Sequence, residues 1–81
     1  MKVNKTNLNK IIHWSPSKYY EYRKSSIIDR ILNLKDGEEF IAHTGSYTEN
    51  NSYGRSYLIT RCKDKLRIAD EKNILILEYE E

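Results

Sequence analysis

The spacing of the apolar residues changes at Gly37, and this change constrains the fold more than any other feature of the chain. From about Pro16 to Lys35 the apolar side chains recur at about 100° per residue, which is typical of an amphipathic helix. After Gly37 they alternate with a period of two, which is typical of strands with one buried face. This order predicts an α+β fold, in which an N-terminal helical segment packs on an antiparallel meander of three or four strands.

The ends of the predicted helix carry recognisable signals. Ser15 suits the N-cap, and Pro16 suits the first helical position, where its missing N–H costs nothing. Trp14 and Tyr19 are spaced to form a hydrophobic staple around that cap. Gly37 suits the left-handed position that ends a helix. We therefore expect one helix, although a second interpretation breaks it into two short helices at Ser25-Ser26.

One side of this helix is expected to face the core. Its members share one sector at 100° per residue: Tyr20, Ile27, Ile28, Ile31, Leu32 and Leu34. A further short helix is expected before it, from Asn7 to His13.

Four segments after Gly37 are expected to be strands. They are Glu38–Thr44, Arg55–Cys62, Lys65–Ala69 and Asn73–Tyr79. On the first, Phe40 and Ala42 share a face; on the second, we expect Leu58, Thr60 and Cys62 to face the helix. The run Ile74–Leu77 is apolar on both faces, so either its strand is central or a homodimer forms through it.

Size, composition and the single cysteine argue against a multidomain, secreted, membrane-spanning or metal-binding protein. Eighty-one residues, 38% of them hydrophobic, predict one domain spanning residues 1–81 with a thin core. Cys62 has no disulfide partner, so we expect a buried structural cysteine and a cytoplasmic location. No apolar run reaches the length of a membrane span, and Met1 to Lys10 lack the apolar core that a signal peptide would have. His13, His43 and Cys62 lack ligand spacing, so neither a metal nor a cofactor is expected.

Positive charge is concentrated in the first half of the chain. Residues 1–35 hold eight bases and two acids, a net charge of +6, whereas residues 36–81 hold six bases and ten acids, a net charge of −4. The centre of the basic half, Lys18 to Lys24, contains three tyrosines. A basic, aromatic surface suits nucleic acid or an acidic protein, although solvated helix charges give the same pattern.

Three groups of residues are candidates for contact with such a partner. On the helix they include Tyr19, Arg23 and Arg30, which with Ser26 follow a helical stripe; tyrosines in the loop 45–54 and bases on the second strand complete the set. The candidates are Lys18, Tyr19, Tyr22, Arg23, Arg30, Tyr47, Tyr53, Arg55, Tyr57 and Arg61. The strand bases have an alternative use in cross-strand pairs with acids such as Asp70 and Glu78.

Three functions fit this surface. The first is a non-enzymatic regulator that binds nucleic acid or nucleoprotein. The second is a stoichiometric inhibitor from a phage or mobile element, directed at a nucleic-acid-binding host protein such as a CRISPR effector. The third is a compact, metal-independent ribonuclease, because the order of helix and strands is similar to that of RelE-like toxins. Its candidate residues for holding RNA and transferring a proton are His43, Arg55, Tyr57 and Arg61. We expect the first, and no catalytic residues.

Overall fold

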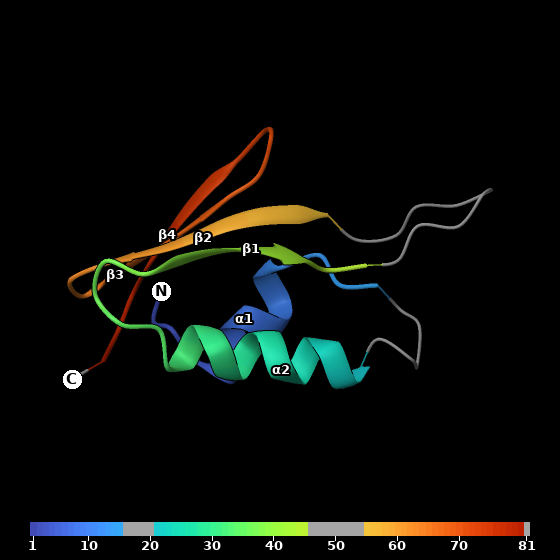
Figure 1. Ribbon diagram of the computed structural model, residues 1–81, viewed down its shortest axis with the longest axis horizontal. Coiled ribbons are helices and arrows are strands. Elements are labelled where there is room, and N and C mark those ends of the chain that lie inside the picture. Colours follow the sequence, from blue (N-terminus) through green and yellow to red (C-terminus); the bar gives the residue numbers. More distant parts are fainter. Residues whose placement is uncertain (16–20, 46–54, 81) are drawn as a thin grey trace.

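The computed structural model describes residues 1–15, 21–45 and 55–80, and their order of elements is helix, helix and four strands. Helix α1 spans Lys5–Ile11 and helix α2 spans Glu21–Leu32. The strands are β1 (Glu39–His43), β2 (Ser56–Cys62), β3 (Lys65–Ala69) and β4 (Ile74–Glu78). They form an antiparallel meander in the order β1-β2-β3-β4 with both helices on one side (Figure 1), which confirms the predicted α+β fold.

Helix α2 is continuous through Ser25-Ser26, so the two-helix interpretation is wrong. The helix ends at Leu32, three residues before the predicted end. Gly37 does not terminate it: with a φ of 85°, it is the third residue of a turn closed by the Glu38 N–H, which donates to the Lys35 carbonyl at 3.0 Å. That position of a type II turn requires a positive φ, which glycine adopts without strain. The predicted start at Pro16, the Tyr19 staple and the core position of Tyr20 lie outside the described residues.

The core face of α2 is narrower than predicted. Ile28 and Ile31 are buried, and so is Leu34 just beyond the end of the helix. Ile27 is partly buried, but Leu32 is 37% exposed. At about 100° per residue Leu32 lies a full step around the helix from Ile31, at the margin of the contact with the sheet. The prediction for Leu32 is therefore wrong.

The predicted short N-terminal helix is present with shifted bounds. Asn4 caps α1, since its side-chain oxygen accepts a hydrogen bond from the Asn7 backbone N–H at 2.8 Å. Leu8 and Ile12 are buried and Ile11 packs against the same core. In the described part of the chain, no helix is long and apolar enough to cross a membrane.

The inner face of the sheet is opposite to the prediction on β2. Tyr57 and Ile59 face the helices and are buried, while Leu58 is 38% exposed and Cys62 is exposed. Register explains the reversal, because Ile59 lies opposite Phe40 on β1 and Ile68 on β3, both of which are buried. The expectations that Leu58, Thr60 and Cys62 face the helix, and that Cys62 is a buried structural cysteine, are therefore wrong.

Strand β4 lies at the end of the sheet rather than at its centre. Leu77 is buried, whereas Ile74 and Ile76 are 58% and 55% exposed. The explanation that Ile74–Leu77 is apolar on both faces because its strand is central is therefore wrong. At its last residue β4 gains a second neighbour: the Val3 N–H donates to the Glu78 carbonyl at 2.8 Å, and the Glu78 N–H donates to the Met1 carbonyl at 2.9 Å.

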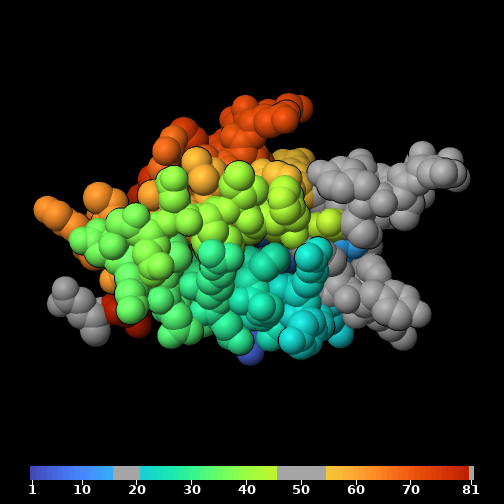
Figure 2. All heavy atoms as spheres, viewed as in Figure 1, coloured from blue at the N-terminus to red at the C-terminus, as the bar shows by residue number. Residues whose placement is uncertain are grey.

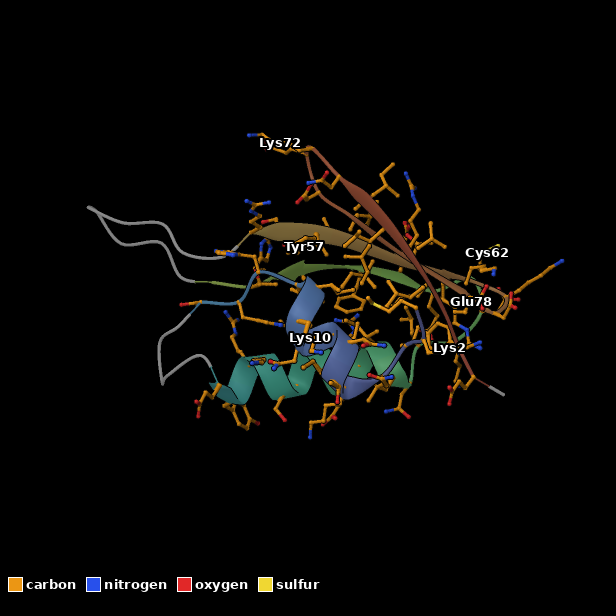
Figure 3. All side chains as sticks on the ribbon, turned by 180° about the vertical axis from the view of Figure 1, so that it is seen from behind. Lys2, Lys10, Tyr57, Cys62, Lys72 and Glu78 are labelled. Atoms are coloured by element: carbon orange, nitrogen blue, oxygen red, sulfur yellow. The ribbon has the colours of Figure 1, made fainter. Side chains whose placement is uncertain are left out.

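The Glu78 side chain joins the N-terminus to the sheet. Its carboxylate contacts the Lys65 ammonium group and, at 3.2 Å, that of Lys2. Figure 3 shows Lys2 and Glu78 together at this end of the molecule. The hydrogen bond from Lys65, then that from Lys2, lowers the Glu78 pKa from 4.5 to about 2.

We expect Glu78→Gln to reduce the sensitivity of the fold to acid. A carboxylate whose pKa is lowered by folding stabilises the protein above its ordinary pKa, and this stabilisation is lost as the pH falls towards the folded-state value. Urea midpoints measured between about pH 5 and pH 2 should therefore fall less in Glu78→Gln than in the wild type. Glu80→Gln is the control; if it changes the pH dependence as much as Glu78→Gln does, the Lys65–Glu78–Lys2 contact is not the cause.

Candidate functional site

A shallow groove lies between α2 and β1, and it contains the described part of the predicted helix stripe. We call it the α2–β1 groove, with a volume of about 200 Å³. Its helix side is formed by Arg23, Ser26, Ile27 and Arg30, and its strand side by Phe40, Ile41, Ala42 and His43. Figure 2 shows this face, with α2 in teal to green running below β1 in yellow-green. The spacing predicted for Arg23, Ser26 and Arg30 thus places them on one wall.

The cations of the groove are held in different ways. The guanidinium carbon of Arg30 lies 4.1 Å from the centre of the Phe40 ring, a cation–π contact that orients the side chain. Arg23 is exposed on the same wall, seven residues earlier, which is about 10 Å along a helix. On the opposite wall, His43 Nδ1 lies 2.8 Å from the Ser56 hydroxyl oxygen.

No Asp or Glu is among the described residues that line the groove. Among the described lining residues, the arginines therefore have no carboxylate that would compete with a bound anion. A second hollow, between α1 and α2, differs in this respect, since Glu21 lines it and its Lys24 lies over the Trp14 ring at 5.8 Å. The α2–β1 groove is the better candidate for an anionic partner.

Most aromatic side chains in the described part of the chain are already covered. Lys24 lies over Trp14, Arg30 over Phe40, and Arg61 over Tyr79 at 4.0 Å. Burial and the Arg61 charge act in opposite directions on the Tyr79 hydroxyl, and burial, the larger effect, raises its pKa. By contrast, Tyr22 on α2 is 84% exposed. Among the described residues, Tyr22 therefore offers the open ring for stacking.

The three candidates on and beside β2 are each engaged in contacts within the molecule. Tyr57 is 5% exposed, and its hydroxyl oxygen accepts a hydrogen bond from the His13 backbone N–H at 3.1 Å. Arg61 also turns to the helix side, where it donates to the Leu34 carbonyl at 2.6 Å and to the Lys63 carbonyl at 2.8 Å. Arg55 forms an ion pair with Asp70 at 3.3 Å. The alternative of cross-strand pairing thus describes Arg55, and the set His43, Arg55, Tyr57 and Arg61 does not converge on one site.

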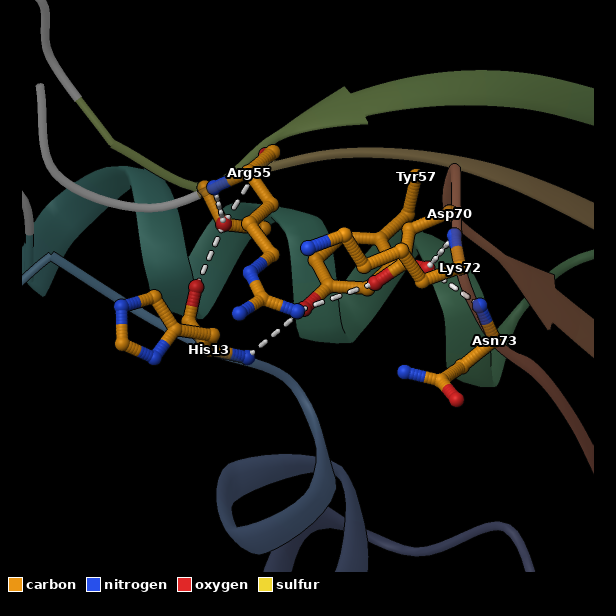
Figure 4. Close-up of polar contacts among 7 residues, drawn as sticks. His13, Arg55, Tyr57, Asp70, Lys72 and Asn73 are labelled. Atoms are coloured by element: carbon orange, nitrogen blue, oxygen red, sulfur yellow. Dashed lines mark hydrogen bonds and ion pairs between the residues drawn. The ribbon is translucent and has the colours of Figure 1, made fainter.

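A polar network fixes the base of the β1–β2 connection (Figure 4). The Thr44 hydroxyl is 2.5 Å from the His13 carbonyl oxygen, to which it donates, and it accepts from the Arg55 N–H at 2.8 Å. Asp70 accepts hydrogen bonds from the backbone N–H groups of Lys72 and Asn73, and these bonds lower its pKa. This network joins three segments that are distant in the sequence, and its groups bond to one another.

Four predicted contact residues, Lys18, Tyr19, Tyr47 and Tyr53, lie outside the described residues. Of the groove residues, Phe40 was not assigned to any site from the sequence, and His43 was named only as a candidate residue of the ribonuclease alternative. No group of His, Cys, Asp and Glu in residues 1–15, 21–45 and 55–80 is arranged to hold a metal ion.

Comparisons with protein-family models, curated proteins and solved structures found no match.

Proposed function

We propose that this chain is a small non-enzymatic binding protein that contacts nucleic acid or a nucleoprotein through the α2–β1 groove. The observation that carries the proposal is the pair Arg23 and Arg30, both exposed on one wall of a groove whose described lining contains no carboxylate. A guanidinium group binds phosphate oxygens in a planar, two-point geometry and stays charged at any physiological pH.

Phosphate contacts dominate the proposed binding mode. The rings of Trp14, Phe40 and Tyr79 lie under cations, so base stacking on described residues falls mainly to Tyr22. Contacts to phosphates position a protein without reading the sequence of bases. We therefore expect binding that tolerates changes of sequence and weakens as the salt concentration rises.

We further propose that the protein acts in the cytoplasm and associates with itself through β4. The cytoplasmic location rests on the single cysteine of the sequence. One cysteine cannot form an internal disulfide, and proteins of a reducing compartment do not need one. The self-association rests on Ile74 and Ile76, which are more than half exposed on a strand at the end of the sheet.

The double variant Arg23→Glu with Arg30→Glu should bind a short DNA duplex or RNA at least about tenfold more weakly than the wild type, because two phosphate contacts become repulsions. Fluorescence anisotropy at about 50 mM and 200 mM salt measures both the affinity and its salt dependence. The control is Lys35→Glu with Lys72→Glu, which makes the same change in net charge at two exposed positions outside the groove. An equal loss in both double variants would mean that overall charge, not the groove, attracts nucleic acid.

A wild-type protein that binds neither DNA nor RNA at about 50 mM salt would contradict direct binding. Affinity purification with and without nuclease then tests the inhibitor alternative. A protein partner that is retained after nuclease treatment and lost in Arg23→Glu with Arg30→Glu would show that the groove recognises an acidic protein surface instead.

A further inference from the structure

The face of the sheet turned away from both helices carries an apolar row that crosses all four strands. Ile41 lies opposite Leu58, Leu58 opposite Ala69, and Ala69 opposite Ile74. Ile41 and Ile74, at the two ends of the row, are 61% and 58% exposed, and Leu58 is 38% exposed. In the described part of the chain both helices cover the other face (Figure 1), so this row has no cover from them.

We propose that a second copy of this chain covers this outer face, so that two sheets pack face to face around a two-fold axis. The inference deepens the self-association proposed above, and of the apolar row Ile41 alone also lines the α2–β1 groove. Sheets packed in this way keep their strands within about 30° of each other and lie about 10 Å apart. A two-fold interface places the same row of residues on both sides, so the row must complement itself.

The apolar row is complementary to itself in size. A two-fold axis parallel to the strands, between β2 and β3, places Leu58 against the partner's Ala69 and Ala69 against the partner's Leu58. A large side chain thus meets a small one at the centre of the interface, as close packing requires. The same axis places Ile41 against the partner's Ile74, so the two most exposed members of the row cover each other.

The next row of residues is partly complementary to itself in charge. It consists of Glu39, Thr60, Arg67 and Ile76, in register across the four strands. The same axis places Glu39 one strand spacing, about 4.8 Å to the side, from the partner's Arg67, and the reverse pair forms by symmetry. Two opposite pairs therefore lie at this offset against one like pair, Arg67 with the partner's Arg67, so the charges of this row attract on balance.

Pairing of two β4 edges is a less favourable arrangement for the same two copies. The edge of β4 is already occupied at Glu78, whose backbone N–H and carbonyl bond to Met1 and Val3. An antiparallel pair of edges would have only Ile74–Leu77 for its hydrogen bonds. The outer face includes β4 but uses all four strands.

The expected dimer is weak. Four strands about 4.8 Å apart and about 17 Å long have a flat area of about 300 Å². Stable complexes bury about 800 Å² of accessible surface per partner. We therefore expect dissociation in the micromolar range or above, visible as a concentration-dependent equilibrium.

Sedimentation velocity of the wild type between about 10 and 500 µM should show a shift from monomer to dimer. Leu58→Asp should raise the dimer dissociation constant at least about tenfold, because it buries a charge against the partner's Ala69. Leu32→Asp makes the same kind of change on the helix side and should leave the constant unchanged. Circular dichroism checks that both variants are folded.

A wild type that stays monomeric at about 500 µM would overturn the inference, and so would a dimer that is retained in Leu58→Asp, since β2 is separated from β4 by β3. The second result would leave self-association through β4 standing. Neither result bears on nucleic-acid binding, which is decided by Arg23→Glu with Arg30→Glu.

Discussion

Replacing Ile31 by alanine should lower the free energy of unfolding by about 2–5 kcal/mol, because it deletes buried methyl and methylene groups and leaves a cavity under the sheet. Ile31 is fully buried, and α2 lies along the inner face of the sheet (Figure 1). A domain of this size has a total stability on the order of 4–12 kcal/mol. The variant should therefore be close to its unfolding transition at 37 °C, as urea denaturation monitored by circular dichroism will measure.

The control for this prediction is the next residue along the helix. Leu32 is 37% exposed, so Leu32→Ala should cost less than about 1 kcal/mol. Equal losses in Ile31→Ala and Leu32→Ala would contradict the rotation of α2 about its axis that the structure shows.

This pair also shows how far periodicity can predict a core. The 3.6-residue pattern placed Ile28, Ile31 and Leu32 on one face, and two of the three are buried. Periodicity finds the direction of the apolar sector but not its width, because the width depends on how much of the helix surface the sheet covers. Leu32 is at the end of the helix and at the margin of that contact.

Which face of β2 points to the core could not be predicted from the residues of that strand alone. Tyr57, Leu58 and Ile59 are three consecutive apolar residues, so both faces of the strand look suitable for the core. Pairing decides between them: Ile59 lies opposite Phe40 and Ile68, which have a clear alternation. The bridge between Lys2 and Glu78 is a contact of the same kind, since 76 residues separate its partners and neither has a local signal for it.

Only the helix side of the candidate site could be predicted, because contacts between distant segments have no local signal. Arg23 and Arg30 share a wall of the groove because of helical spacing, which a sequence contains. Phe40 and His43 join them from β1 through tertiary packing, which has no local pattern. The cation–π contacts of Lys24, Arg30 and Arg61 likewise join residues from different elements, and they reduce the number of rings open for stacking.

Replacing Thr44 by valine should lower the free energy of unfolding by about 2–3 kcal/mol, although the two side chains have nearly the same shape. Thr44 is fully buried just after β1. Its hydroxyl bonds to the His13 carbonyl at 2.5 Å and to the Arg55 N–H at 2.8 Å. Valine removes both bonds and leaves the partly buried His13 carbonyl and Arg55 N–H without this partner, which is why the expected cost exceeds that of a surface hydrogen bond.

The control for Thr44→Val is Thr60→Val. The Thr60 hydroxyl lies on the outer face of the sheet with a long, 3.4 Å contact to Glu39, so the cost should be within about 0.5 kcal/mol. Because Thr44 joins residues 13–15 to the ends of β1 and β2, its loss should also loosen these segments together. Hydrogen exchange should then accelerate at the Ser15 N–H, which donates to the Thr44 carbonyl at 2.7 Å, and at the Arg55 N–H. Faster exchange at only one of these two amides would mean that the three segments open separately and that the Thr44 hydroxyl does not couple them.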